Sequence, residues 1–206
     1  MKAAHRKQHI LECAKQLFAA QGFYRTQISD IIKEAKIARG TIYQYFDNKQ
    51  DIFVTLLENT YDQWEQAIST AVRDINLQAI TPEEYLRLRV ETTLAFLVAD
   101  PDICNIVMTM GFGLPMELEE ATRRLEEKIR IIAINDFKLG IHNGHIRGDL
   151  NVEHVGEMIA GAIFRSAYYA LTRHQEPSKI DVKTLTNDFV ALFAPGIFRK
   201  DQLSSS

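Results

Sequence analysis

Residues 26–53 read TQISDIIKEAKIARGTIYQYFDNKQDIF, and this stretch decides the fold of the N-terminal part of the chain. Apolar residues recur at helical spacing from Ile28, just after Thr26, which we expect to cap a short helix. Ile42 and Phe46 lie four residues apart, so both side chains fall on one face of a second short helix. Two short helices joined by a tight turn, the second with an exposed polar surface, predict a helix-turn-helix.

The polar faces of the second helix suit the major groove of DNA. A glutamine pairs bidentately with adenine, an arginine pairs with guanine or phosphate, and a threonine contacts a thymine methyl group. Tyrosine hydroxyls reach phosphates, and a lysine at the start of the next helix adds a charge beside free backbone N–H groups. The candidates for these contacts are Arg39, Thr41, Tyr43, Gln44, Tyr45 and Lys49.

The same stretch resembles the DNA-binding domain of the TetR family of bacterial transcriptional regulators. The residues that carry the resemblance are Thr26, Asp30, Ile31, Ala35, Gly40, Thr41, Tyr43, Tyr45, Phe46 and Lys49. It implies phosphate contacts by Thr26, Thr41, Tyr43, Tyr45 and Lys49. It also implies that Ser29, Arg39, Gly40 and Gln44 lie nearest the base edges, although a serine in the first turn of a helix also serves as a cap.

Two residues depart from the family pattern. Lys36 stands where the turn usually has glycine, so we expect either a left-handed backbone at this lysine or an altered turn. Ala38 stands where the pattern has serine, and the loss of a side-chain cap costs about 1 kcal/mol. The motif tolerates both changes.

The rest of the chain predicts an all-α fold of about nine helices, with no strand-like alternation. Asn48 and Asp51 resemble a capping pair, and residues 81–84 (TPEE) combine a cap, a first-turn proline and a capping-box glutamate. We expect a helix-turn-helix domain over residues 1–48 and a helical ligand-binding and dimerisation domain over residues 49–206. A helix from residue 49 to about residue 72 would link the two.

Charge and composition favour a cytoplasmic protein that meets DNA. Through residue 49 the chain has nine Lys and Arg against four Asp and Glu, a balance of +5, and the remainder has 15 against 23, a balance of −8. Such asymmetry indicates that the first segment faces a polyanion. No apolar run is long enough for a membrane span. Cys13 and Cys104 lie far apart and outside any CxxC, so we expect neither a disulfide nor a zinc site.

The resemblance implies a C-terminal helical domain that dimerises and often holds an effector. Side chains that would line an effector cavity, or alternatively form plain core, are Phe96, Met108, Met110, Phe112, Phe137, Phe164 and Tyr168. Small residues beside large apolar ones suggest a four-helix dimer interface, or alternatively burial within one subunit. The interface candidates are Gly156, Ile159, Ala160, Ile163, Phe189 and Phe193.

We therefore expect a sequence-specific DNA-binding regulator, a ligand-responsive repressor that binds a palindromic operator as a homodimer. The alternatives are a helical-bundle metal-dependent enzyme and a protein-binding adaptor. Inward Glu-x-x-His pairs, HExxH and glycine-rich phosphate loops are absent from the sequence, so we expect no enzyme and no cofactor. His142, His145 and His154 with Asp149 suggest a metal site, but histidines at a helix end explain them more simply.

Overall fold

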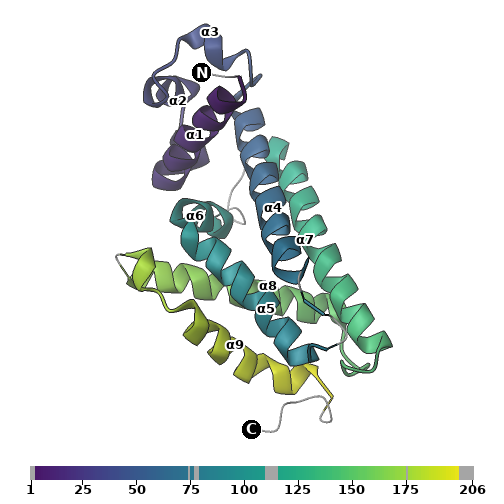
Figure 1. The fold of residues 1–206 in the computed structure, drawn as a ribbon. Helices are drawn as coiled ribbons and strands as arrows, with labels where there is room; N and C mark the ends of the chain where they lie inside the picture. The colour runs from purple at the N-terminus through teal and green to yellow at the C-terminus, as the bar shows by residue number, and fades with distance from the viewer. Residues whose placement is uncertain (1–2, 74, 77–78, 110–115, 175, 200–206) are drawn as a thin grey trace. The chain divides into compact units, whose positions relative to one another are not determined.

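The computed structural model describes residues 3–73, 75–76, 79–109, 116–174 and 176–199. Within these ranges the chain is all-α, as predicted, with nine α-helices and a short 3₁₀ turn (Figure 1). The helices are α1 (Ala3–Arg25), α2 (Ile28–Glu34), α3 (Arg39–Ile42), α4 (Lys49–Arg73), α5 (Pro82–Ala99), α6 (Pro101–Thr109), α7 (Met116–His142), α8 (Val152–Arg173) and α9 (Val182–Ile197).

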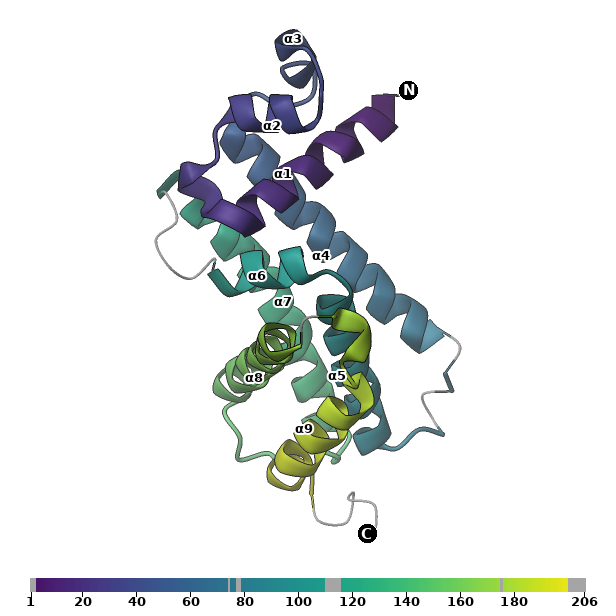
Figure 2. The ribbon, with the colours of Figure 1, turned by 90° about the vertical axis from the view of Figure 1, so that its left-hand side faces the viewer.

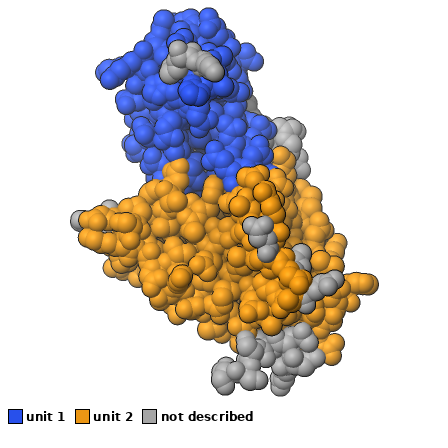
Figure 3. Space-filling view, viewed as in Figure 1, with its two compact units in different colours: residues 1–63, 102–125 blue, residues 64–101, 126–206 orange. Residues whose placement is uncertain are grey.

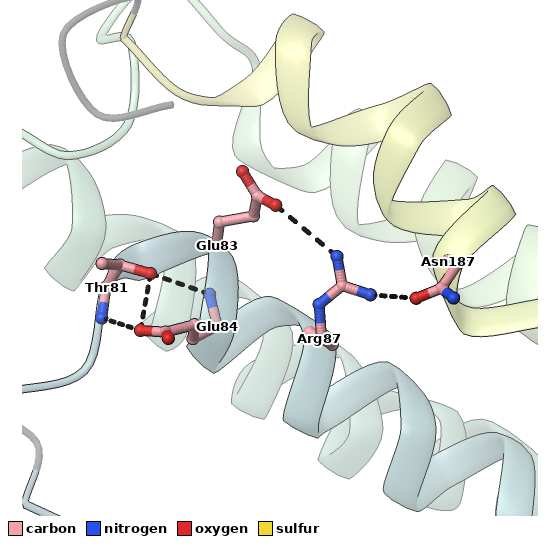
Figure 4. Close-up of polar contacts among 5 residues, drawn as sticks. All are labelled: Thr81, Glu83, Glu84, Arg87 and Asn187. Carbon is pink, nitrogen blue, oxygen red and sulfur yellow. Dashed lines mark hydrogen bonds and ion pairs between the residues drawn. The ribbon is translucent and has the colours of Figure 1, made fainter. Parts of the chain in front are cut away.

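Two of the predicted helix starts are confirmed by their hydrogen bonds. The Asn48 side-chain oxygen accepts from the Asp51 N–H at 2.8 Å, at the beginning of α4. At the beginning of α5, the Glu84 N–H donates to Thr81 Oγ1 at 3.2 Å, and the Thr81 N–H donates to Glu84 Oε2 at 2.7 Å (Figure 4). This reciprocal pair is a capping box, which satisfies backbone donors that the first turn would otherwise leave open.

The chain divides into two compact units, which Figure 3 shows in different colours. Unit 1 comprises residues 1–63 and 102–125, and unit 2 comprises residues 64–101 and 126–206. The division falls inside α4, between Gln63 and Trp64, so α4 contributes residues to both units. The expected domain division at residues 48 and 49 stays a prediction.

Unit 1 contains the helix-turn-helix. There α2 packs against α1 and α3 packs against α2 (Figure 2). Gly22, with φ 81° and ψ 164°, interrupts α1 and redirects the chain toward α2. The rings of Phe18, Phe23 and Phe53 meet with centroids 5.1–5.7 Å apart. These aromatic contacts tie α1 to the first turns of α4.

In unit 2, α5 packs against both α8 and α9 (Figures 1 and 2). Its inward face carries Val90, Leu94 and Leu97, all of which are buried. Among the helices of the described residues, none is long and apolar enough to cross a membrane. The described residues also contain no cluster of histidine, cysteine or carboxylate side chains that could hold a metal ion.

Candidate nucleic-acid interface and ligand cavity

The second element of the helix-turn-helix has the inward and outward faces that its sequence predicts. Ile42 and Phe46 retain only 1% and 3% exposure. The regular helix α3 ends at Ile42, and the backbone continues as a helical turn in which the Tyr45 and Phe46 N–H groups both donate to the Ile42 carbonyl at 3.0 Å. Of the predicted DNA contacts, the exposed ones are Ser29, Arg39, Gly40, Tyr43 and Gln44, and the half-exposed ones are Thr41 and Tyr45.

The sequence predicts either a left-handed backbone at Lys36 or an altered turn between α2 and α3, and the structure has the left-handed backbone. Lys36 has φ 52° and is the one residue other than glycine with positive φ in the described part of the chain. The Lys36 N–H donates to the Lys33 carbonyl at 3.2 Å and the Ile37 N–H donates to the Ile32 carbonyl at 3.2 Å. The nearby Ala35 carbonyl lies 3.2 Å from His9 Nε2 of α1. The tight turn therefore forms without its usual glycine.

Gly40 lies in open space at the start of α3. Apart from the two neighbouring residues and the backbone of its own helix, no heavy atom lies within 4 Å of a Cβ atom built on Gly40. Its φ is not in the left-handed region either. The chain's own packing therefore does not require glycine at this position.

The predicted role of Thr26 requires correction. Its side chain is fully buried, and its hydroxyl donates to the Gly22 carbonyl at 2.9 Å. The Gln21 side-chain amide donates to the same hydroxyl at 3.2 Å. The cap of α2 is Gln27, which forms a capping box with Asp30. A buried hydroxyl that is already bonded cannot contact DNA, so the predicted phosphate contact of the Thr26 side chain is wrong.

Lys49 also has a different role from the one predicted. Its Nζ donates to the carbonyl oxygens of Phe23 and Thr26, both at 2.8 Å, and lies 3.5 Å from that of Tyr24. The ammonium also lies 4.2 Å from the centroid of the Phe23 ring. Desolvation lowers the pKa of Lys49, and the carbonyl contacts offset the cost of placing a charge here. The side chain joins the start of α4 to the end of α1 and points at carbonyls rather than at a phosphate.

Unit 2 contains a cavity of about 340 Å³, within the range of small-molecule sites. Most of its wall is apolar, formed by Ile80, Pro82, Leu86, Val90, Ile129, Ile132, Ala133, Phe137, Leu139, Ile146, Ile159, Ala160, Ile163, Phe164, Ile197 and Phe198. The remaining lining residues are Trp64, Thr81, Tyr85, Arg89, Thr93, Asp136, Gly140, Asn143, His145 and Gly156. An apolar cavity with a few convergent polar groups is typical of a ligand site.

Three polar side chains that contact one another lie in the wall of this cavity, namely Tyr85, Arg89 and Asp136. Arg89 of α5 forms an ion pair with Asp136 of α7, with 3.0 Å between the guanidinium nitrogen and Oδ2. The Tyr85 hydroxyl donates to Asp136 Oδ1 at 3.5 Å. Burial raises the pKa of Asp136, and the charge of Arg89 opposes that rise. Burial, with the nearby Asp136 charge, likewise raises the pKa of Tyr85.

The predicted effector residues divide into three groups. Phe137 and Phe164 line the cavity. Phe96, Met108 and Tyr168 are half-buried and are not part of its wall. Met110 and Phe112 lie outside the described residues. The polar lining residues Tyr85, Arg89 and Asp136 were not among those predicted from the sequence. The signal available in the sequence was a charged residue, Arg89, between the apolar residues Leu86 and Val90 of the same helix.

Most residues predicted for the dimer interface lie in the packing of the chain itself. Gly156, Ile159, Ile163 and Phe189 are buried within one chain, which is the alternative that the sequence left open, and their place in a dimer interface stays a prediction. A Cβ atom at Gly156 would meet the Cβ of Ala133 at 3.8 Å, so the small residue accommodates α7.

The other two predicted interface residues are only partly accessible. Ala160 is half-buried and lines the cavity. Phe193 is also half-buried, and it stacks on Phe189 with centroids 4.5 Å apart. The strongly exposed apolar side chains of α8 and α9 are Met158 (64%), Tyr169 (53%) and Leu192 (75%), and none of them was among the interface residues predicted from the sequence.

Comparison with known proteins gives a family match for the helix-turn-helix and relatives over most of the chain. Residues 10–56 match the family described as "Bacterial regulatory proteins, tetR family". A fatty acid metabolism regulator protein of Bacillus subtilis is 29% identical over 198 residues, which cover 93% of this chain and 95% of that protein. The HTH-type transcriptional repressor NicS of Pseudomonas putida is 27% identical over 175 residues, which cover 84% and 79% of the two chains.

Two solved structures share the fold over nearly the whole chain. The transcriptional regulator FadR of Bacillus subtilis, in complex with stearoyl-CoA, is 27% identical with a TM-score of 0.76, covering 92% of this chain and 98% of that one. The fatty acid degradation regulator FadR of Bacillus halodurans, at 22% identity, has a TM-score of 0.78 and covers 95% and 98%. These relatives are regulators and not enzymes, which agrees with the expectation from sequence. Residues 10–56 therefore belong to the TetR family of bacterial transcriptional regulators, and the relatives named above resemble this chain over most of its length.

Proposed function

We propose that this protein is a repressor that binds a palindromic operator as a homodimer and releases it when a fatty acyl compound, such as a long-chain acyl-CoA, occupies the cavity of unit 2. The observation that carries the ligand assignment is the apolar cavity of about 340 Å³. The relative of known structure, the Bacillus subtilis FadR, was solved with stearoyl-CoA and aligns with 92% of this chain. An apolar cavity suits the hydrocarbon part of such a ligand.

The DNA-reading part of the proposal rests on the exposed side chains around α3. Arg39, Tyr43 and Gln44 are exposed, while Ile42 and Phe46 anchor the element to the core of unit 1. We assign Gln44 and Arg39 to base edges, since their side chains make bidentate contacts in a major groove. Tyr43, Thr41 and Tyr45 are assigned to phosphates. Ser29 and Gly40 complete the surface that faces the groove.

The homodimer is proposed because a single short reading element gives little specificity, whereas two half-sites related by a two-fold axis give enough. The exposed apolar side chains Met158, Tyr169 and Leu192 on α8 and α9 support a contact surface there. Burial of these side chains against a partner would remove apolar surface from water, which is favourable. This surface differs from the one expected from the sequence.

The link between ligand and DNA is proposed to run through α4. Trp64 of α4 lines the cavity, and Lys49 at the other end of the same helix holds the end of α1. A ligand shifts the protein toward a state with low DNA affinity only if it binds that state more tightly. Ligand binding in the cavity must therefore favour a position of α4 different from the one that α4 has when the cavity is empty.

Selection of bound fragments from random duplex DNA, followed by titration of the recovered site with dodecanoyl-CoA, tests this function. The expected result is an inverted repeat whose affinity for the protein falls when the acyl-CoA is present and falls steeply with added salt. Recovery of no preferred sequence would reject specific DNA binding. An operator affinity that saturating acyl-CoA leaves unchanged would reject the effector.

Two substitutions separate base reading from phosphate contact. Gln44→Ala should relax the preference at particular base pairs, with a loss of about 1–3 kcal/mol at those positions. Tyr43→Phe removes only a hydroxyl and should weaken binding to all sequences alike. A Gln44→Ala protein with the sequence preference of the wild type would show that Gln44 does not read bases.

A further inference from the structure

The cavity wall is mostly apolar, yet it contains a charged pair, Arg89 and Asp136. Arg89 and Asp136 lie among aliphatic and aromatic side chains, and their charged atoms are 3.0 Å apart. The pair is only partly exposed, at 19% for the Arg89 side chain and 34% for that of Asp136. Such a pair contributes little net stability, because partial desolvation and side-chain ordering offset much of the attraction. An apolar pair could join α5 to α7 as well. The location of the pair in the wall of a cavity therefore indicates recognition of a polar group.

The guanidinium of Arg89 has donors to spare for a ligand. It carries five N–H groups, and a carboxylate such as that of Asp136 accepts two at most in a bidentate contact. The remaining N–H groups of a side chain that lines the cavity suit a carbonyl oxygen. Asp136 itself is held by the Tyr85 hydroxyl, so the carboxylate is oriented from both sides.

The pair also sets the charge of the cavity. Arg89 and Asp136 cancel each other, and the other ionisable lining residues are Tyr85 and His145. A carboxylate entering this site would lose its hydration and lie near the Asp136 carboxylate, which costs free energy. An uncharged carbonyl would accept from Arg89 without that repulsion.

We propose that Arg89 donates to the acyl carbonyl oxygen of the effector, with Asp136 as its fixed counterion, so that the cavity binds uncharged acyl esters and thioesters in preference to free fatty acids. The apolar wall, including Phe137 and Phe164, holds the hydrocarbon chain. This inference rests on the proposed acyl effector and adds the residues that select its head group.

Trp64 supplies the assay. It is the single tryptophan of the chain, it lines the cavity, and its indole N–H donates to Thr93 Oγ1 at 3.1 Å. Wild-type protein is titrated separately with methyl dodecanoate and with dodecanoate, in mildly alkaline buffer and with dodecanoate kept below its critical micelle concentration. Binding of either ligand should change the fluorescence of Trp64. We expect the ester to bind at least about tenfold more tightly than the acid, because only the acid brings an uncompensated charge into the cavity.

Removing the counterion should reverse this preference. Asp136→Asn keeps a side-chain oxygen for Tyr85 but leaves the Arg89 charge uncompensated. We expect the affinity for dodecanoate to rise about tenfold or more while that for the ester changes little. Arg89→Met should weaken binding of the ester, because the donor to its carbonyl oxygen is lost. The same variant should not improve binding of dodecanoate, because the Asp136 carboxylate remains and has lost its counterion.

The matched control is Arg87→Met, two residues along the same helix. Arg87 bonds Asn187 and lies 3.5 Å from Glu83, and it is not among the cavity-lining residues (Figure 4). Both ligand affinities should keep their wild-type values in this variant. If Arg87→Met lost as much affinity for the ester as Arg89→Met, the effect would not be specific to the arginine in the cavity wall. That result would overturn the assignment of Arg89.

The remaining outcomes separate the two proposals. Equal affinities of the wild type for ester and acid, or an unchanged ratio in Asp136→Asn, would overturn the selection by Arg89 and Asp136 while leaving the acyl effector in place. If Asp136→Asn loses its helical circular dichroism, the wild-type ratio alone decides. If neither ligand nor dodecanoyl-CoA alters Trp64 fluorescence or the melting temperature, the acyl effector itself is rejected, and this inference with it.

Discussion

The Nζ atom of Lys49 lies 2.8 Å from the carbonyl oxygen of Thr26, and the hydroxyl of Thr26 in turn donates to the Gly22 carbonyl at 2.9 Å. The two residues were expected on the DNA surface, yet together they hold the end of α1 against the start of α4. Carbonyls at the end of a helix lack partners within that helix, so a cation is favourable there. The resemblance at these positions therefore reflects folding of the DNA-binding unit as well as its use.

Replacement of Lys49 by methionine should destabilise the protein. Methionine retains an apolar side chain of similar length but leaves the Phe23 and Thr26 carbonyls without their charged donor, and hydrogen bonds to charged groups contribute about 1.5–3 kcal/mol. We expect a loss of about 2 kcal/mol in the free energy of unfolding, measured with urea. Lys33→Met, at an exposed position of α2, is the control and should change stability little. A Lys49→Met protein as stable as the wild type would refute the structural role.

Gly40→Ala separates stability from DNA binding. A methyl group has open space at this position and alanine favours a helix over glycine, so stability should stay the same or rise by up to about 1 kcal/mol. If Gly40 faces the groove, the same methyl group should weaken operator binding by about tenfold through steric contact with DNA. Gel-shift titration and thermal melting measure the two effects. Gly196→Ala also adds a methyl group into open space and should not affect DNA binding.

Glu84 makes the stability depend on pH in the acid range. Hydrogen bonds from the backbone and side chain of Thr81 lower the pKa of Glu84 below its ordinary value. The unfolded state therefore binds protons first, so the stabilisation is complete above about pH 5 and is lost as the pH falls through the folded-state pKa. Glu84→Gln cannot titrate and should make the fall in melting temperature between about pH 5 and pH 3 shallower. Glu65→Gln, at an exposed position of α4, should leave the acid limb as it is.

Leu192→Glu should disrupt the proposed dimer. Leu192 is 75% exposed on α9, so a glutamate is compatible with the fold of one chain. In a dimer interface the same charge would lose its hydration, which we expect to raise the dissociation constant at least about tenfold. Sedimentation equilibrium measures it, with Lys183→Glu near the start of α9 as the control. If Leu192→Glu left the dissociation constant of the dimer unchanged, Leu192 would not be part of the dimer interface.

The helix-turn-helix was predictable because its signals are local. The inward pair Ile42 and Phe46, the capping pair at Asn48 and the left-handed option at Lys36 each depend on residues a few positions apart. Thr26 was assigned wrongly because a threonine before a helix has the same sequence signal whether it caps or is buried. Only the break at Gly22, which brings a free carbonyl to the hydroxyl, distinguishes the two.

The cavity of unit 2 is formed by tertiary contacts, which the periodicity of the sequence does not reveal. Small residues such as Gly156 show that a neighbour comes close, but not whether that neighbour is α7 of the same chain or a helix of a second one. Arg89 and Asp136 are far apart in the sequence, and each alone resembles an ordinary surface charge. Their pairing, and the apolar wall around it, exists only once α5 and α7 are folded.

The backbone of Lys36 has a consequence for engineering the protein. A left-handed conformation costs an L-residue about 1–2 kcal/mol, whereas glycine adopts it freely. Lys36→Gly should therefore yield a more heat-resistant regulator, with a melting temperature raised by a few degrees in a calorimeter, less the entropy that glycine adds to the unfolded chain. The tight turn between α2 and α3 is therefore a place where the heat resistance of the protein can be raised.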